Sequence, residues 1–328
     1  MAIAIVGAGS WGTALATIAA HNVEVILYTR DKERAIEMNS SRTNERYLSD
    51  IDLNDRIRIT SDVNDVNGID SLVIAVPSIA FREAVEKFAH LDIEIPYVSV
   101  TKGLERNTNY RMSQVVSDAD PKRTLENFAV LGGPNLAAEI AQGEPAATVI
   151  ASTNTEVASS VQKVFLTKKF RAYITDDVVG CEIAGVAKNV VAIAVGIGDG
   201  LGYGDNAKAA VMTRGLAEIS RLGQAEGGKK ETFSGLAGLG DLIATCSSSL
   251  SRNRTVGYQL GKGKTLAEIK ETSSDIAEGV YSVEALLARG KELGVEMPIA
   301  EGVAKVVQDG KLSPDAVDAL MSRPAGRE

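Results

Sequence analysis

The sequence predicts an α/β fold in its first half, with a doubly wound and mostly parallel sheet, followed by an all-α second half. Short apolar strands alternate with helical segments over roughly the first 130 residues, and a glycine-rich turn, GAGSWG, directly follows the first strand. After about Thr175, long segments rich in alanine and leucine replace the strands. Strands that alternate with helices at this spacing form a parallel sheet covered on both faces. In a chain of 328 residues we therefore expect two domains, residues 1–175 and 176–328.

The predicted strands of the first half are short and apolar, as strands buried on both faces are. They are Ala2–Val6, Val23–Tyr28, Ile57–Thr60, Ser71–Val76, Pro96–Val100 and Phe128–Leu131, and this set is expected to be complete. Helical spacing predicts helices from the end of GAGSWG to about Ala20, over Asp31–Asn39 and over Ser78–Ala89. In the second half, the helical segments are separated by GYGDN, GGKK, GLAGLGD and GKGK.

Composition excludes several classes of protein. The net charge of −8 argues against a protein that binds nucleic acid by charge alone. Cys181 and Cys246 have no metal-like spacing, so we expect reduced thiols and no metal site. No export signal is visible, and the longest apolar run, residues 183–198, is interrupted by Lys188 and Asn189 and is short for a membrane span. We expect a soluble, cytoplasmic protein with no nucleic-acid or membrane partner.

Two polar residues, Lys188 and Asn189, interrupt the most apolar segment, GVAKNVVAIAVGIGDG. Such a lysine either packs its stem and keeps its head in solvent, or lines a wet cavity and finds partners there. The segment alone favours the first interpretation. The two histidines, His21 and His90, fall where helices should end and have no plausible catalytic neighbour in sequence. Another residue must therefore carry any proton transfer.

The turn GAGSWG matches the G-x-G-x-x-G pattern in the context that the pattern requires, after a strand and before a helix. Gly7 allows the tight turn, Gly9 lets a pyrophosphate approach the backbone, and Gly12 lets helix and strand pack closely. The helix N-terminus offers amide donors and a favourable dipole to the phosphates. The sequence thus predicts a Rossmann domain that binds a dinucleotide.

The residues that follow the second strand bear on the choice of cofactor. The strand ends in Leu27-Tyr28-Thr29-Arg30, with Asp31 one step later. An arginine at this place can bind the 2′-phosphate of NADP(H), so we expect NADPH to be preferred and NADH to be possible. The alternative is that Arg30 stacks on the adenine or lies in solvent while Asp31 caps the next helix.

Four further stretches contain polar residues or glycines that packing of a folded core would not require. Lys102 of SVTKGLE follows a strand, as does LGGPN, residues 131–135. Asp241 and Thr245 of GLAGLGDLIATC lie four residues apart on one face of a helix beginning near Gly240. SRNR, residues 251–254, offers two arginines beside an asparagine. Each has an ordinary explanation alone, but together with Lys188 and Asn189 they suit a small phosphorylated hydroxy or keto substrate.

Over nearly the whole chain, a series of motifs resembles the bacterial NAD(P)-dependent glycerol-3-phosphate dehydrogenases. In order, these motifs are GAGSWGTALA, VPS, TKGLE, GP, GVAKNVVAIAVGIGDGLGYGDNAKAAVMTRGLAE, GLAGLGDL, SRNR and VEMPI. The resemblance implies a Rossmann domain followed by a helical domain like that of 6-phosphogluconate dehydrogenases. It implies reduction of dihydroxyacetone phosphate to sn-glycerol 3-phosphate, which feeds phospholipid synthesis.

The resemblance also implies roles for individual residues. Lys188 would be the proton donor and acceptor, Lys102 would contact both substrate and cofactor, and Arg252 would hold the phosphate and also contact the cofactor. The other expected substrate contacts are Gly133, Asn135, Asn189, Asp241, Thr245, Ser251 and Asn253. The other expected cofactor contacts, beside the three glycines, are Ser10, Trp11, Arg30, Tyr47, Ala137, Ile276 and Glu278.

This chain departs from the family pattern in two places. The family loop is commonly Ser-Gly-Pro followed by Ser or Thr and Phe, where this chain has Gly132-Gly133-Pro134-Asn135-Leu136. We expect altered substrate affinity and retained chemistry, since an amide can replace the hydroxyl as a donor. DIAEG, residues 275–279, stands where VVEG is common, a milder change.

The expected mechanism delivers a hydride from NADPH to the carbonyl carbon while Lys188, facing a polar cleft between the domains, protonates the oxygen. Lys102 and Asn189 would polarise that oxygen. Burial and Lys102 would lower the pKa of Lys188 and Asp241 would raise it, so the direction of the net change stays open. Two alternatives remain: a related reductase of another small keto or hydroxy acid, and a noncatalytic NAD(P) sensor. A homodimer is expected from the apolar helical half.

Overall fold

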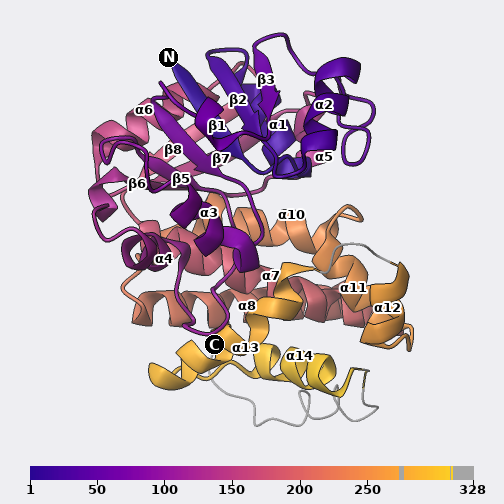
Figure 1. Cartoon of the computed structure of the whole chain (residues 1–328). Helices are drawn as coiled ribbons and strands as arrows, with labels where there is room; N and C mark the ends of the chain where they lie inside the picture. The colour runs from indigo at the N-terminus through magenta and orange to yellow at the C-terminus, as the bar shows by residue number, and fades with distance from the viewer. Residues whose placement is uncertain (273–276, 311, 313–328) are drawn as a thin grey trace. The chain divides into compact units, whose positions relative to one another are not determined.

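The computed structural model describes residues 1–272, 277–310 and 312. These residues form two compact units that divide between Glu182 and Ile183 (Figure 1). The first unit contains one eight-stranded sheet. Its strands are β1 (Ala2–Val6), β2 (Glu24–Tyr28), β3 (Ile57–Thr60), β4 (Ser71–Ile74), β5 (Tyr97–Ser99), β6 (Phe128–Gly132), β7 (Ala146–Ala151) and β8 (Phe170–Thr175).

The strand order in the sheet is β3-β2-β1-β4-β5-β6-β7-β8. Strands β1 to β6 are parallel, whereas β7 runs antiparallel to β6 and pairs in parallel with β8. The order reverses between β1 and β4, and ligands of doubly wound sheets bind at this switch point, beyond the carboxyl ends of the strands. GAGSWG follows β1 at that edge.

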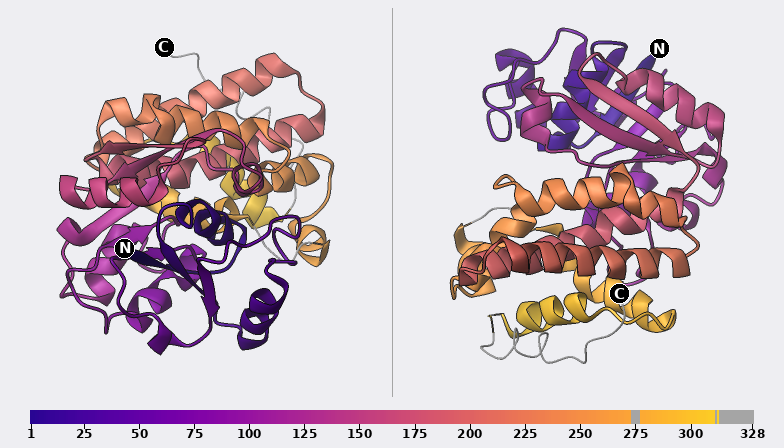
Figure 2. Two further views of the ribbon diagram at one scale, coloured as in Figure 1. Left: turned by 90° about the horizontal axis from the view of Figure 1, so that it is seen from above. Right: turned by 180° about the vertical axis from the view of Figure 1, so that it is seen from behind.

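The prediction of a doubly wound, mostly parallel sheet is confirmed, but the prediction that six strands complete it is wrong. The sheet continues into β7 and β8, which the sequence analysis left unassigned (Figure 2). β7 is the sequence AATVIA, half of which is alanine, a residue depleted in strands. β8 alternates buried and exposed residues at the edge of the sheet and therefore lacks a continuous apolar run.

Helices cover both faces of the sheet. Their bounds are α1 (Ser10–Ala19), α2 (Lys32–Ser41), α3 (Phe81–Lys87), α4 (Met112–Ala119), α5 (Ala137–Ala141) and α6 (Thr155–Phe165). Because side chains of a strand alternate between faces, Leu27 of β2 joins the core cluster that contains Leu15 of α1 and Phe165 of α6. Its neighbour Tyr28 contacts Phe88, just after α3, with ring centroids 5.2 Å apart.

Among the described residues, every regular element from Val178 onward is helical, as predicted. The bounds are α7 (Val178–Leu201), α8 (Asp205–Ala225), α9 (Lys230–Ser234), α10 (Asp241–Ser247), α11 (Arg252–Gly261), α12 (Leu266–Thr272), α13 (Glu278–Glu292) and α14 (Pro298–Asp309), with a π-helical turn over Leu236–Gly240. α7 is long and apolar enough to cross a membrane, but 89% of its most apolar stretch is buried inside the protein. It is therefore the core helix of the second half.

Helices α7 and α11 approach each other so closely that their backbones touch. A Cβ atom at Gly196 of α7 would overlap the carbonyl oxygen of Arg254, and one at Gly257 of α11 would overlap that of Ile193. One turn further along, a Cβ at Gly200 would lie 2.8 Å from the Cα of Gly261. Glycine at these positions is required by the helix separation.

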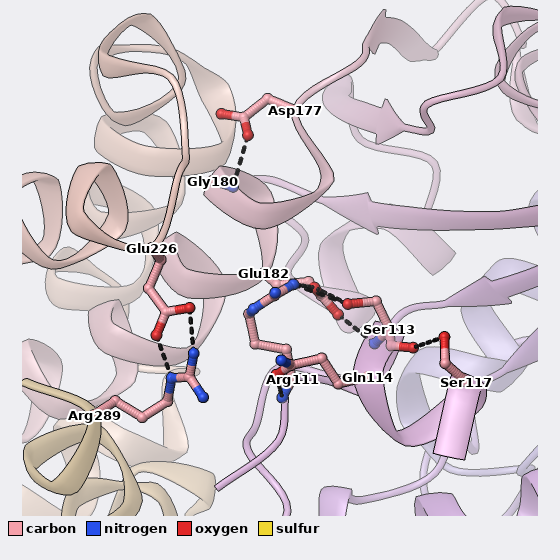
Figure 3. A network of polar contacts seen from close by, with 9 residues as sticks. All are labelled: Arg111, Ser113, Gln114, Ser117, Asp177, Gly180, Glu182, Glu226 and Arg289. Carbon is pink, nitrogen blue, oxygen red and sulfur yellow. Dashed lines mark hydrogen bonds and ion pairs between the residues drawn. The ribbon is translucent and has the colours of Figure 1, made fainter. Parts of the chain in front are cut away.

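The first turns of α7 are anchored within the first unit by two carboxylates (Figure 3). Asp177 accepts a hydrogen bond from the backbone N–H of Gly180 at 2.9 Å. Glu182, which is buried, accepts hydrogen bonds from the N–H and hydroxyl of Ser113 at 2.7 and 2.6 Å, and its Oε2 lies 2.8 Å from Nη1 of Arg111. The start of the helix is thereby tied to α4.

A buried carboxylate of α8 caps α14 in the second unit. Glu218 is 3% exposed, and it accepts hydrogen bonds from the N–H groups of Ile299 at 2.7 Å and Ala300 at 3.4 Å. Burial raises the pKa of Glu218 from 4.5 to about 7, against the opposing effect of these two backbone donors. The folded state therefore binds a proton here more tightly than the unfolded chain does.

This predicts a pH dependence of stability that Glu218→Gln should remove. Because the folded-state pKa is raised, the stabilisation is fully present below about pH 4.5 and is lost as the pH rises through about 7. We expect wild type to lose roughly 3 kcal/mol relative to Glu218→Gln over this range. Urea unfolding of both proteins at several pH values measures the difference, and parallel pH profiles would contradict the prediction.

Candidate active site

The glycine-rich turn after β1 has the geometry of a phosphate cradle. Gly7 has φ +112°, and a Cβ there would lie 2.5 Å from the carbonyl oxygen of Ala75, just beyond β4. A Cβ at Gly12 would overlap the carbonyl oxygen of Gly7, whereas a Cβ at Gly9 would meet no atom of the described chain within 4 Å. The space in front of Gly9 and the N-terminus of α1 thus fits a dinucleotide pyrophosphate.

The indole of Trp11 lies in the first turn of α1. Its Nε1 is buried and makes no hydrogen bond within the part of the chain that the structure describes. A buried donor without a partner is costly, so Trp11 is suited to donate to a bound ligand. Ser10, the other expected contact of this turn, is the first residue of α1.

Arginines surround Tyr47 beyond the carboxyl end of β2. The guanidinium of Arg34 lies 4.6 Å from the ring centroid, and that of Arg46 lies 5.3 Å from it. Arg34 also donates to the carbonyl oxygen of Ala8 in the glycine turn, and burial lowers its pKa. Arg30 is exposed at the end of the strand.

Asp31 caps α2, since its carboxylate accepts a hydrogen bond from the N–H of Arg34 at 3.1 Å. Asp31 therefore caps the helix after β2, as expected in the alternative interpretation in which Arg30 does not bind a 2′-phosphate.

Lys102 and Gly133, both predicted substrate residues, lie together at the carboxyl edge of the sheet. The Nζ of Lys102 donates to the carbonyl oxygen of Gly133 at 2.9 Å. Gly133 has φ +115°, in the region that favours glycine. Glu105 of the same TKGLE motif forms a two-point pair with Arg82, with distances of 2.7 and 2.9 Å, which holds the loop that carries Lys102.

Asn135 continues this loop and has one free acceptor. Its Nδ2 donates to Oγ1 of Thr148 at 3.1 Å, and Thr148 in turn donates to the carbonyl oxygen of Gly132 at 2.7 Å. The Oδ1 of Asn135 is buried without a hydrogen-bond partner in the described chain. Such an atom is suited to accept from a ligand hydroxyl. The loop ends at Ala137, which begins α5.

Lys188 does not have its head in solvent. Its side chain is 8% exposed, and its Nζ lies 3.0 Å from Oδ1 of Asp241, whose side chain is 2% exposed. The Nζ also donates to Oγ1 of Thr245 at 2.6 Å, and that hydroxyl lies 3.2 Å from the same Asp241 oxygen. The interpretation that favoured a solvated head is wrong, because α7 buries Lys188 and α10 supplies a carboxylate and a hydroxyl for its charge.

The amides of Asn189 and Asn253 join three helices. The Nδ2 of Asn253 donates to Oδ1 of Asn189 at 2.9 Å, and its Oδ1 accepts from the N–H of Gly279 at 2.9 Å. A Cβ at Gly279 would lie 2.8 Å from the carbonyl oxygen of Asn189, so only glycine lets α13 approach this closely. Ser251 caps α11 by accepting from the N–H of Arg254 at 3.3 Å.

Neither thiol is available as a nucleophile. Burial raises the pKa of Cys246, the neighbour of Thr245, to about 12, and it raises the pKa of Cys181 well above its usual range. Both side chains are buried. Within the described ranges, no group of His, Cys, Asp and Glu side chains could hold a metal ion. The candidate for proton transfer at this site is therefore Lys188, with its partners Asp241 and Thr245.

Each unit thus gathers some of the predicted residues. The first brings Lys102 to Gly133 and Tyr47 to the arginines beside the glycine turn, and the second brings Lys188 to Asp241 and Thr245, and Asn189 to Asn253. Arg252 and Glu278 are the first residues of α11 and α13. Ile276 lies outside the described residues.

Sequence reasoning missed Arg34, Thr148 and Gly279. Arg34 lies four residues after Arg30 on the next helix, so its basic character was a usable signal. Thr148 gave none, because its partners are distant in sequence. Gly279 is the last residue of DIAEG, where only Ile276 and Glu278 were predicted to make contacts.

Comparison with known proteins covers both units. Residues 2–158 match the family model described as the NAD-dependent glycerol-3-phosphate dehydrogenase N-terminus, and residues 177–318 match its C-terminus. Similar proteins include the glycerol-3-phosphate dehydrogenases [NAD(P)+] of Frankia casuarinae and Streptomyces griseus. They are 46% and 47% identical over 328 residues, covering 99% of this chain and 97% of each relative.

Solved structures are similar over the same length. Glycerol-3-phosphate dehydrogenase from Coxiella burnetii has a TM-score of 0.93 at 36% identity, covering 98% of this chain and 99% of that one. A ketopantoate reductase from Ralstonia eutropha has a TM-score of 0.61 at 18% identity, covering 94% of this chain and 97% of that one, and shows the shared fold alone.

The Lys188–Asp241 pair makes a prediction about stability. Asp241→Ala removes the carboxylate from a buried ammonium and should cost about 3 to 5 kcal/mol. Replacing both residues, Lys188→Met with Asp241→Leu, should recover most of that loss, because no buried charge then remains. Urea unfolding of the three proteins tests this. If the free energy of unfolding of Asp241→Ala were within about 1 kcal/mol of wild type, burial of the Lys188 ammonium would not depend on Asp241.

Proposed function

The chain belongs to the family of NAD-dependent glycerol-3-phosphate dehydrogenases, and we propose that it reduces dihydroxyacetone phosphate to sn-glycerol 3-phosphate with Lys188 as the proton donor. The observation that carries the proposal is the buried ammonium of Lys188, held by Asp241 and Thr245. A charged donor in a dry, polar setting is what a carbonyl reduction needs, since negative charge grows on the carbonyl oxygen.

Lys188 would transfer a proton from Nζ to the substrate oxygen and regain it from solvent. Asp241 and Thr245 restrict the Nζ to one position, so the donor is oriented before the substrate arrives. Asn189 follows Lys188 on α7, and its amide oxygen is occupied by Asn253. We propose that the amide of Asn189 also contacts the substrate beside Lys188.

The remaining substrate contacts follow from the chemistry of the molecule. Arg252 would bind the phosphate dianion, with Ser251 and Asn253 beside it at the start of α11. The unsatisfied Oδ1 of Asn135 supports a contact with a substrate hydroxyl. Lys102 would approach both substrate and cofactor. The change from Ser-Gly-Pro to Gly132-Gly133-Pro134 leaves these donors in place, so altered affinity with retained chemistry is expected.

The bound cofactor supplies the hydride to the carbonyl carbon. Gly7, Gly9 and Gly12 with Ser10 and Trp11 would hold its pyrophosphate end, and Ala137, Arg252, Ile276 and Glu278 are further proposed contacts. NAD(P) dependence is a property of the family, and we propose a preference for NADPH. Exposed Arg30 and the stacked cations beside Tyr47 support a site for a 2′-phosphate.

We further propose a division of the chain at residues 175/176, a homodimer, a cytoplasmic location and a role in supplying glycerophospholipid synthesis. Neither of the two alternative functions has a specific observation in its favour. The ketopantoate reductase shares only 18% of residues with this chain, and a noncatalytic sensor would leave the Lys188–Asp241 pair without a purpose.

The first test is NADPH and NADH oxidation, followed at 340 nm, with dihydroxyacetone phosphate and with unphosphorylated dihydroxyacetone. We expect strong preference for the phosphorylated substrate, because a phosphate held by an arginine contributes several kcal/mol of binding. If the protein binds NADPH but turns over neither substrate, the proposed reaction is wrong, and a noncatalytic sensor or a reductase of another substrate is favoured.

Lys188→Ala should lower kcat by about 10²- to 10⁴-fold, since it removes the positioned acid. NADPH affinity, measured by fluorescence titration, should stay within twofold of wild type, because the glycine turn is unchanged; this also serves as the control for folding. A folded variant with near-wild-type kcat would overturn the assignment of Lys188.

Arg30→Gln should weaken NADPH binding about tenfold and leave NADH binding unchanged, because a charged hydrogen bond to the 2′-phosphate contributes roughly 1.5 kcal/mol or more. Arg56→Gln is the matched control, since Arg56 is an exposed arginine near Glu24, at the other end of β2. Equal losses for both cofactors would instead favour stacking of Arg30 on the adenine.

A further inference from the structure

Asp199 joins three helices through two cations. It lies on α7, and its side chain is 10% exposed. Its Oδ2 lies 2.6 Å from Nη2 and 2.8 Å from Nε of Arg254 on α11, and its Oδ1 lies 2.9 Å from Nζ of Lys208 on α8. Asp199 thus links α7 to a residue of the SRNR motif on α11, and the mechanism above gives it no role.

Arg254 is the second arginine of SRNR and cannot act as Arg252 does. Its Nε and Nη2 are both directed at Asp199, which compensates its charge. The cavity beside Asp199, Tyr203 and Lys208 has a volume of about 30 Å³, room for roughly one or two water molecules. Arg254 is thus a structural partner of Asp199.

The first turn of α11 is consequently held from two sides. Arg254 is fixed to Asp199, and Asn253 is fixed to Asn189 and Gly279. Behind this turn, the backbones of α7 and α11 are in contact at Gly196. Arg252 lies in the same turn, so these contacts decide where its Cα stands and in which direction its side chain leaves the helix.

We propose that Asp199, through Arg254, is a positioning residue for phosphate recognition by Arg252. The inference rests on the proposed function, in which Arg252 binds the substrate phosphate. Arginine gains most from a phosphate when its planar fork meets the oxygens in a fixed geometry. Loosening the turn therefore weakens recognition of a phosphorylated ketone and leaves the reaction of an unphosphorylated one unchanged.

Asp199→Asn tests the proposal, since asparagine keeps the shape and removes the charge that holds Arg254. We expect KM for dihydroxyacetone phosphate to rise tenfold or more. Inhibition by inorganic phosphate should weaken similarly. In contrast, kcat/KM for dihydroxyacetone and the Kd for NADPH should stay within twofold of wild type. A purely structural role would lower activity toward both substrates together.

Three further variants complete the experiment. Arg254→Met should reproduce the effect of Asp199→Asn, and the double variant should be no worse than either single one, because both act through one contact. Arg254→Met also decides the question if Asp199→Asn does not fold. Glu226→Gln is the matched control: it breaks the buried Glu226–Arg289 pair of the same unit (Figure 3) and should leave the ratio of the two substrates unchanged.

The outcomes separate the inference from the function on which it rests. Wild type that does not prefer the phosphorylated substrate would reject Arg252 as the phosphate ligand. Wild type that does prefer it, with folded Asp199→Asn or Arg254→Met showing an unchanged substrate ratio, would reject only the role of Asp199.

Discussion

The ammonium of Lys188 imposes the constraint on which the second half of the structure depends. A charge buried to this extent persists only with a carboxylate and further hydrogen bonds close by. Asp241 and Thr245 meet that need because they stand four residues apart on one face of α10. Each of the two helices must therefore be turned about its own axis so that Lys188 faces Asp241 and Thr245. An apolar contact could form with the helices turned in several ways, but this contact can form in only one.

Glycine makes the same arrangement possible on the other side of α7. Backbone contact leaves no space for side chains at the point where Gly196 of α7 meets α11 and Gly257 of α11 meets α7. The short separation lets side chains as small as asparagine, Asn189 and Asn253, bridge the helices with one hydrogen bond. Wider spacing would leave these buried amides unsatisfied, at a cost of about 1 to 3 kcal/mol each. The hydrogen bond between the two amides therefore offsets the cost of burying them in an otherwise apolar helix contact.

Contacts between residues close in sequence could be predicted, and contacts between residues far apart in sequence were missed. The glycine turn and the Asp241–Thr245 face are set by spacing within a few residues, and both appear in the structure as expected. The Lys102–Gly133 and Asp199–Arg254 contacts join residues 31 and 55 apart. They depend on loop paths and helix crossings that no local pattern encodes. β7 and β8 were missed because their local signals are weak: half of AATVIA is alanine, which is depleted in strands, and β8 alternates buried and exposed residues.

The two arginines of SRNR show how position decides chemistry for identical side chains. Arg254 faces a carboxylate across the α7–α11 contact, so its charge is neutralised and its donors on that side are used within the protein. Arg252, two residues earlier, projects about 200° away around the same helix and so cannot share the carboxylate that occupies Arg254. Arg254 therefore stabilises the start of the helix through Asp199, whereas Arg252 is the proposed ligand of the phosphate. A single arginine could not both pair with Asp199 to hold the helix and bind a ligand.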